Sequence, residues 1–64
     1  MKLIDLLNVI DGDMSVNITV EYREVFDGVL NNHYYPQELK VKILEREVKS
    51  VWYSKIYERI MIEC

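Results

Sequence analysis

The chain has very few of the residues on which disulfide-rich, zinc-binding and phosphate-binding proteins depend. Its 64 residues include 1 cysteine, 1 histidine, 1 proline and 2 glycines. One cysteine cannot form an internal disulfide, which small secreted domains usually need. One histidine cannot form a zinc site, and no glycine-rich phosphate loop is present. These absences argue against a secreted disulfide scaffold, a zinc domain and a phosphate-binding loop.

Long hydrophobic runs are also missing. No apolar segment approaches the roughly 20 residues that a membrane-spanning helix requires. At the start of the sequence, Leu3 and Ile4 are followed at once by Asp5, which interrupts the apolar core that a secretory leader needs. The sequence therefore predicts a soluble, cytoplasmic protein without a membrane partner.

Hydrophobic residue types nevertheless make up 50% of the sequence, and charged residues make up 30%. A chain of this length forms one domain, residues 1–64, and a domain near this size buries only about 60% of the surface of its unfolded chain. So much apolar material in so small a domain leaves some of it exposed in a monomer. The composition therefore predicts a homo-oligomer or a hydrophobic surface for a partner.

The net charge of −3 is unevenly distributed. Residues 1–32 hold two basic and six acidic side chains, and the acids are Asp5, Asp11, Asp13, Glu21, Glu24 and Asp27. The one cationic cluster is interleaved with Glu38, Glu45 and Glu47, and it consists of Lys40, Lys42, Arg46 and Lys49. This pattern is typical of a mixed solvated face rather than of a basic stripe, so no direct binding to DNA is expected.

In the first half of the chain the hydrophobic spacing changes from helical to alternating. Apolar residues at helical spacing predict a short helix over residues 3–10, which Asp11-Gly12-Asp13 ends. Alternation over residues 15–22 predicts a strand with Val16, Ile18, Val20 and Tyr22 on its inner face. A tight connection at Arg23-Glu24 and a second strand over residues 25–30 would complete a hairpin.

The second half opens with a loop over residues 31–36 and is then harder to interpret. Residues 36–44 favour a short helix that begins at Pro36, although alternation of Leu39, Val41 and Ile43 also suits a strand. Strands are predicted over residues 47–53 and 57–64, joined by a turn at residues 54–56. The expected fold is α+β: a small antiparallel β-sheet or partly open barrel of about four strands in two hairpins, with two short helices.

Catalytic and metal-binding patterns are weak. A nucleophilic pair of Cys64 and His33 would need a terminal residue held firmly in place, so Cys64 is better interpreted as a hydrophobic residue at a strand end. Asp11-Gly12-Asp13 resembles the start of a calcium loop, but the later ligands are missing, which favours a helix-ending turn. We therefore expect no enzyme activity, no cofactor and no metal site.

The aromatic residues provide the candidate binding site. The chain has five tyrosines and one tryptophan, residue types that combine contact area with a polar group. The candidate binding residues are His33, Tyr34, Tyr35, Lys42, Trp52 and Tyr53. Three roles remain open for the aromatic rings: packing in the core, contact with an oligomer or partner, and stacking on a ligand.

Some sequence motifs are similar to those of a known group. The segment Met1-Lys2-Leu3-Ile4-Asp5-Leu6-Leu7, the Asp11-Gly12-Asp13 turn and the segment from Leu44 to Val51 resemble small uncharacterised proteins of phages and mobile elements of Firmicutes. These motifs are structural, so they assign no functional residue. The resemblance implies a phage-type accessory protein that acts by binding, in the cytoplasm of the host cell.

Two functions and one neutral alternative follow from this resemblance. The first is an inhibitor that self-associates and blocks a host defence protein, with its acidic half contacting a basic target. The second is an oligomeric sponge that encloses a nucleotide signal, with bases on Tyr34, Tyr35 and Trp52 and phosphates at Lys40, Lys42 or Arg46. The third is a structural or assembly module with no ligand.

Overall fold

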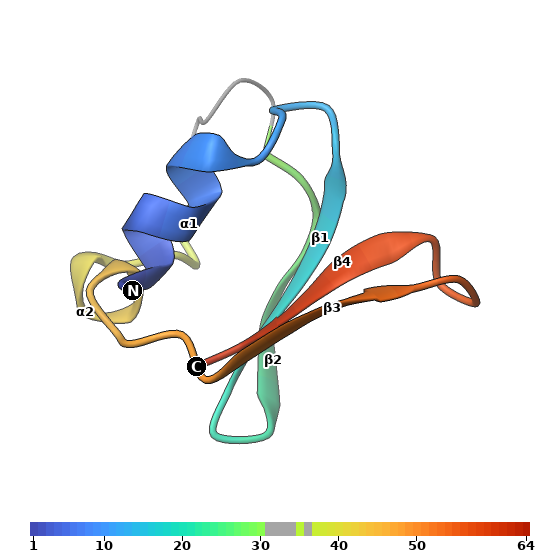
Figure 1. Cartoon of the computed structure of the whole chain (residues 1–64). Helices are drawn as coiled ribbons and strands as arrows, with labels where there is room; N and C mark the ends of the chain where they lie inside the picture. The colour runs from blue at the N-terminus through green and yellow to red at the C-terminus, as the bar shows by residue number, and fades with distance from the viewer. Residues whose placement is uncertain (31–34, 36) are drawn as a thin grey trace.

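The computed structural model describes residues 1–30, 35 and 37–64, and it is built around one four-stranded β-sheet (Figure 1). The elements in chain order are α1 (Leu3–Val9), β1 (Ser15–Val20), β2 (Arg23–Val29), α2 (Val41–Leu44), β3 (Ser50–Ser54) and β4 (Arg59–Glu63). The strand order across the sheet is β2-β1-β4-β3, and the sheet is open rather than closed into a barrel. The expected α+β class, with four strands in two hairpins and two short helices, is confirmed.

The sheet is mixed in direction. Both hairpins, β1–β2 and β3–β4, are antiparallel as expected, whereas β1 and β4 pair in parallel at the centre. The segment that connects β2 to β3 and contains α2 returns the chain so that β4 runs alongside β1. Alternation along a strand shows which side chains share a face, but it does not show the direction of the neighbouring strand. The parallel pairing of β1 and β4 therefore could not be predicted from the local sequence pattern.

The first hairpin turns two residues earlier than predicted. Glu21 and Tyr22 form the turn with φ angles of 50° and 69°, and β2 already begins at Arg23. The expected connection at Arg23-Glu24 was therefore wrong, and the strand over residues 15–22 ends at Val20. Two consecutive positive φ angles are typical of a type I′ turn, whose twist matches that of an antiparallel pair. Tyr22 is consequently exposed rather than on the inner face.

This turn makes the first testable prediction. Tyr22 is 92% exposed and has a φ of 69°, a backbone region that costs a residue with a Cβ atom about 1–2 kcal/mol. Replacing Tyr22 by glycine relieves this strain and adds some entropy to the unfolded chain, for an expected net gain of about 0.5–1 kcal/mol. Urea denaturation should show a higher midpoint for Tyr22→Gly. Tyr22→Ala removes the same ring but keeps the Cβ atom, so equal midpoints for the two variants would refute the explanation.

The segment expected to be helical over residues 36–44 contains a helix of one turn only. α2 begins at Val41 because Lys40 is extended, with φ −66° and ψ 161°, and residues 37–39 form a turn. The alternative of a strand is wrong for this segment, and Pro36 lies outside the described residues. Leu39 and Leu44 are both buried, so this turn and helix still contribute an apolar side to the core.

The remaining boundaries differ from the predicted ones by one to three residues. α1 ends at Val9 because Ile10 is extended. The second strand was predicted over residues 25–30, whereas β2 runs from Arg23 to Val29 and includes Gly28. β3 begins at Ser50 rather than at residue 47, since Glu47 forms an isolated bridge with Lys2 instead. β4 begins at Arg59 because Glu58 has a φ of 54° and belongs to the loop.

The core lies between the two helices and one face of the sheet. In Figure 1 both helices lie on the same side of the strands. Val16 and Ile18 of β1 and Ile62 of β4 point to this side, where Leu3 and Leu7 of α1 cover them, and all five side chains are at most 1% exposed. The other buried core residues are Leu30, Leu39, Leu44 and Cys64. The opposite face of the sheet carries no helix in the described part of the chain.

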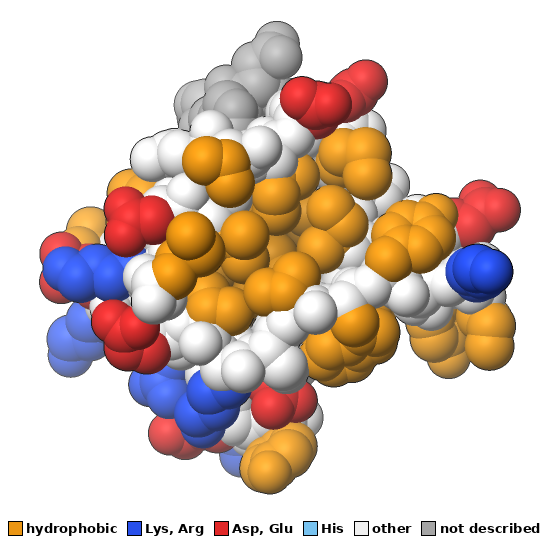
Figure 2. All heavy atoms as spheres, in the orientation of Figure 1, with side chains coloured by type: hydrophobic (Ala, Val, Ile, Leu, Met, Phe, Trp, Pro, Cys, Tyr) orange, Lys and Arg blue, Asp and Glu red, His pale blue; other side chains and the backbone are white. Residues whose placement is uncertain are grey.

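The helices do not cover this core completely. Figure 2 shows hydrophobic side chains gathered in a continuous area between α1 and the strands, with acidic and basic side chains around it. Among individual side chains, Val9, Val41, Ile56 and Tyr57 are each more than 60% exposed. The chain thus displays apolar surface as a single copy, in line with its composition.

Candidate binding site

The face of the sheet that carries no helix, called here the helix-free face, is rich in acidic and polar side chains. The strand registers place Asn17 of β1 beside Asp27 of β2 and Met61 of β4 on this face. The other strand residues on the face are Ser15, Thr19, Glu24, Val29, Ser50, Trp52, Ser54, Arg59 and Glu63. Its charged members are three acids, Glu24, Asp27 and Glu63, and one base, Arg59, which give these strands a net charge of −2 on this face.

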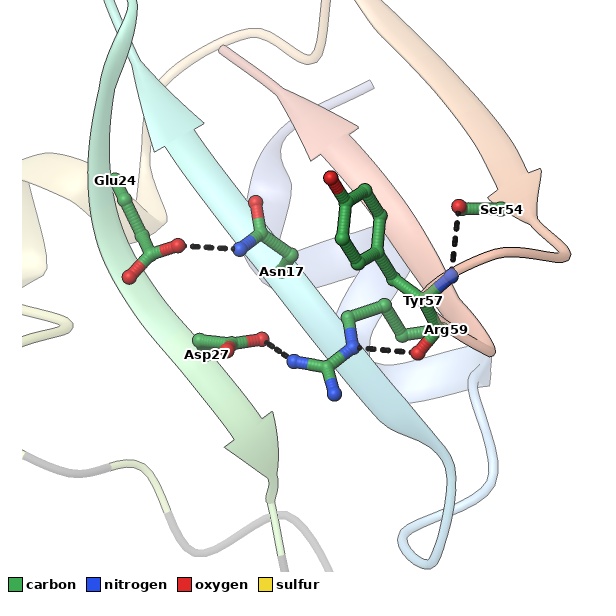
Figure 3. Close-up of polar contacts among 6 residues, drawn as sticks. All are labelled: Asn17, Glu24, Asp27, Ser54, Tyr57 and Arg59. Carbon is green, nitrogen blue, oxygen red and sulfur yellow. Dashed lines mark hydrogen bonds and ion pairs between the residues drawn. The ribbon is translucent and has the colours of Figure 1, made fainter.

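A shallow pocket opens on the helix-free face. It has a volume of about 360 Å³ and is lined by Asn17, Glu24, Asp27, Tyr57, Arg59 and Met61. These residues come from β1, β2, β4 and the loop between β3 and β4. Figure 3 shows Glu24 pointing toward Asn17, and Asp27 toward Arg59, across the sheet. We refer to this hollow as the acidic pocket.

Asn17 is the buried polar group at the centre of the acidic pocket. Its side chain is 7% exposed, and its Nδ2 donates a hydrogen bond of 2.7 Å to Oε1 of Glu24 (Figure 3). A buried amide without a partner costs about 1–3 kcal/mol, so Glu24 satisfies Asn17 and is held in place by it. The contact joins the central strand β1 to the edge strand β2.

Arg59, the first residue of β4, also lines the acidic pocket. Its guanidinium pairs with the carboxylate of Asp27, and its Nε donates a hydrogen bond of 3.0 Å to the backbone oxygen of Tyr57. The backbone N–H of Tyr57 donates in turn to Oγ of Ser54 at 3.2 Å. These contacts fix the loop that carries Tyr57 against the sheet, as Figure 3 shows.

The two carboxylates of the pocket differ in how their charge is compensated. Asp27 has a cationic partner in Arg59, whereas Glu24 accepts from the neutral amide of Asn17. Among the described residues, Glu24 forms no ion pair. The acidic pocket therefore keeps one uncompensated negative charge beside a guanidinium that is already neutralised.

The single cysteine of the chain does not lie at the acidic pocket. Cys64 lies in the core on the other side of the sheet, and burial raises the pKa of its thiol, which keeps the sulfur protonated. Its interpretation as a hydrophobic strand-end residue is confirmed by its exposure of 1%. Within residues 1–30, 35 and 37–64, no three His, Cys, Asp or Glu side chains are grouped so that they could hold a metal ion.

The candidate binding residues from the sequence are not gathered at the acidic pocket. His33 and Tyr34 lie outside the described residues. Tyr35 packs against the core, donates a hydrogen bond of 2.7 Å to Oδ1 of Asn8, and has a pKa raised by burial. Lys42 is exposed on α2.

The two aromatic residues of β3 point to opposite faces of the sheet. Trp52 is opposite Met61 on the helix-free face, and Tyr53 is opposite Ile60 on the face that carries the helices. Both rings are about half exposed. Within one copy of the chain, Tyr35 and Trp52 are therefore on different sides of the sheet and cannot stack on one base.

Most of the acidic pocket could not be predicted from the sequence. Glu24 and Asp27 were among the six acids assigned to a basic target, but Asn17, Tyr57, Arg59 and Met61 were not singled out. The one available signal was Asn17, a polar residue in the middle of a strand of β-branched residues. The sequence places Asn17 correctly on the face of β1 opposite to Val16 and Ile18. Its burial depends on neighbouring residues of β2 and β4, which the local pattern does not show.

Comparison of the chain with models of protein families, with curated proteins and with solved structures finds no match in any of the three. None of the described helices has both the length and the apolar character needed to cross a membrane.

Proposed function

We propose that this protein is a small, non-enzymatic accessory protein that acts by binding a basic segment of another protein at its helix-free face. The observation that carries the proposal is the uncompensated carboxylate of Glu24 in the acidic pocket, on a face with three acids and one base. A partner with lysine or arginine side chains complements this charge.

The dimensions and chemistry of the acidic pocket fit one cationic side chain. A lysine or arginine entering it would reach Glu24 while Arg59 remains paired with Asp27. The ring of Tyr57 is 64% exposed at the pocket and offers a face for a cation–π contact. A guanidinium can donate two hydrogen bonds to a carboxylate, which favours arginine over lysine.

The phage-type resemblance of the sequence suggests the class of target. Host defence proteins that act on nucleic acids expose basic channels or grooves, because they must neutralise phosphate charge. A small acidic protein seated on such a surface excludes the nucleic acid. We therefore propose inhibition of a host defence protein by direct contact as the biological role.

Calorimetric titration with a short glycine-spaced peptide that carries three arginines tests the binding step. Binding is expected for the chain, and Glu24→Gln should weaken the affinity about tenfold, since a charge-assisted hydrogen bond becomes a neutral one. Glutamine can still accept the hydrogen bond from Asn17, so the fold is retained.

Two controls make this titration decisive. Glu45→Gln removes the same charge at an exposed residue next to α2 and should change the affinity less than twofold. A peptide with citrulline in place of each arginine has the same shape without charge and should not bind. Equal affinities for the arginine and citrulline peptides, or equal losses from Glu24→Gln and Glu45→Gln, would overturn the proposal.

A further inference from the structure

The two edges of the sheet differ in how they are protected against pairing with another strand. In the part of the chain that the structure describes, residues 1–30, 35 and 37–64, the strand order leaves β2 and β3 each with one unpaired side. β2 carries the charged residues Arg23, Glu24 and Asp27, and its pairing with β1 has an irregular register. Charged side chains and bulges on an edge strand discourage the addition of a further strand.

β3 has none of these protections. Its five residues are Ser-Val-Trp-Tyr-Ser, without a charge, a proline or a glycine, and its register with β4 is regular. The three central residues are exposed in succession, Val51 by 46%, Trp52 by 48% and Tyr53 by 55%. An uncharged edge strand with exposed apolar side chains is a template for a further strand.

The sequence of β3 also identifies which strand fits. The sequence of β3 is nearly the same when it is read from either end: a serine, then an apolar residue (valine from one end, tyrosine from the other), then the central tryptophan. An antiparallel pair of two such strands is therefore matched along its whole length. Self-complementarity of this kind is what a two-fold symmetric interface requires.

We propose that β3 is a dimerisation edge, which pairs antiparallel with β3 of a second copy of the chain across a two-fold axis at Trp52. In this register Trp52 lies opposite Trp52 of the second copy, and Val51 lies opposite Tyr53. Aromatic–aromatic and aromatic–β-branched pairs are among the cross-strand pairs that stabilise sheets. The two sheets then form one sheet of eight strands.

The faces of the sheet fix this register. A shift by one residue would bring side chains of the helix-free face opposite those of the core face, and a shift by two would leave one end of each strand unpaired. Lys49 and Lys55 flank β3 outside the strand, and the dimer brings Lys49 of one copy near Lys55 of the other. Salt screens this repulsion, so the dimer should strengthen as salt increases.

The inference is independent of the proposed function. Glu24 and Asp27 lie on β2, at the opposite edge of the sheet from β3. A five-residue edge buries less than the roughly 1,200 Å² of a standard stable interface. The expected dimer is therefore weak, with a dissociation constant on the order of 100 µM.

Sedimentation equilibrium over a range of concentrations tests the dimer. The molar mass of the chain should rise from 7.7 kDa toward twice that value as the concentration passes the dissociation constant. Val51→Lys places a charge on β3 and should keep the chain monomeric. Val29→Lys, the same substitution on the other edge strand, should leave dimerisation unchanged, and circular dichroism verifies that both variants fold.

The register has its own measurement, because Trp52 is the only tryptophan of the chain. Two tryptophans facing each other across the axis should produce an exciton couplet in the circular dichroism spectrum, and the couplet should grow with concentration and vanish in Val51→Lys. A chain that stays monomeric at millimolar concentration would overturn the proposal. So would loss of the dimer in Val29→Lys with retention in Val51→Lys, or a dimer without the couplet.

Discussion

Replacing Ile18 by alanine is expected to leave a large part of the population unfolded at 25 °C. Ile18 is 0% exposed, and its register neighbours are Phe26 of β2 and Ile62 of β4. Truncation of a buried isoleucine to alanine costs about 2–5 kcal/mol through lost apolar burial and the cavity left behind. A domain of this size rarely has more than about 3–5 kcal/mol in total. Urea denaturation followed by circular dichroism measures the loss.

The control for this substitution is Val9→Ala, since Val9 is 74% exposed at the end of α1. It removes apolar atoms that face solvent and should change the free energy of unfolding by less than about 0.5 kcal/mol. If Ile18→Ala lowered the free energy of unfolding by less than about 1 kcal/mol, Ile18 could not be a fully buried core residue, because truncating such an isoleucine costs about 2–5 kcal/mol.

Reversing the charge of the acidic pocket is expected to reverse its choice of partner. The double variant Glu24→Lys and Asp27→Lys changes the net charge of the helix-free face from −2 to +2, since each substitution adds two units. Affinity for the arginine peptide should fall by at least 30-fold, because truncating or opposing a close charge pair costs about 2–5 kcal/mol. A peptide with glutamate in place of each arginine should bind instead. Because a lysine at position 24 cannot accept the hydrogen bond of the buried Asn17 amide, circular dichroism first verifies that the variant folds, and titration calorimetry with both peptides then measures the exchange.

The matched control for charge reversal uses acidic residues in and after α1, outside the acidic pocket. Asp5→Lys and Asp11→Lys make the same change in total charge at two exposed residues in and after α1. These substitutions should reduce arginine-peptide binding less than threefold, because neither residue lines the acidic pocket and exposed charges are screened by salt. A comparable loss in both double variants would mean that net charge, and not the acidic pocket, attracts the peptide.

The elements that could be predicted from the sequence are those encoded by local patterns. Leu3 and Leu7, from the segment with helical spacing, and Val16 and Ile18, from the alternating segment, all lie in the core. Val9 of the first pattern and Tyr22 of the second are exposed instead. Both patterns depend on residues within a few positions of one another. Cys64 was interpreted correctly for the same reason, because it continues the alternation of the last strand.

The features that escaped prediction depend on contacts between distant segments. The turn at Glu21 and Tyr22 carries no glycine or asparagine, so its positive φ angles had no residue signature. The acidic pocket joins Asn17 of β1 to Glu24 of β2 and places Arg59 of β4 against Asp27. These two contacts depend on the strand order β2-β1-β4-β3, in which β4 pairs with β1, a strand some 40 residues earlier in the chain.

The measurement that tests the central claim most directly is nuclear magnetic resonance mapping of the arginine peptide on the isotope-labelled chain. Amide and side-chain signals of Asn17, Glu24 and Arg59 should shift on titration and saturate together, because all three residues line the acidic pocket. Signals of Leu3 and Leu7, in the core on the other face of the sheet, should stay unchanged. Shifts centred on α1 or α2, with the signals of Asn17 and Glu24 unmoved, would contradict the account.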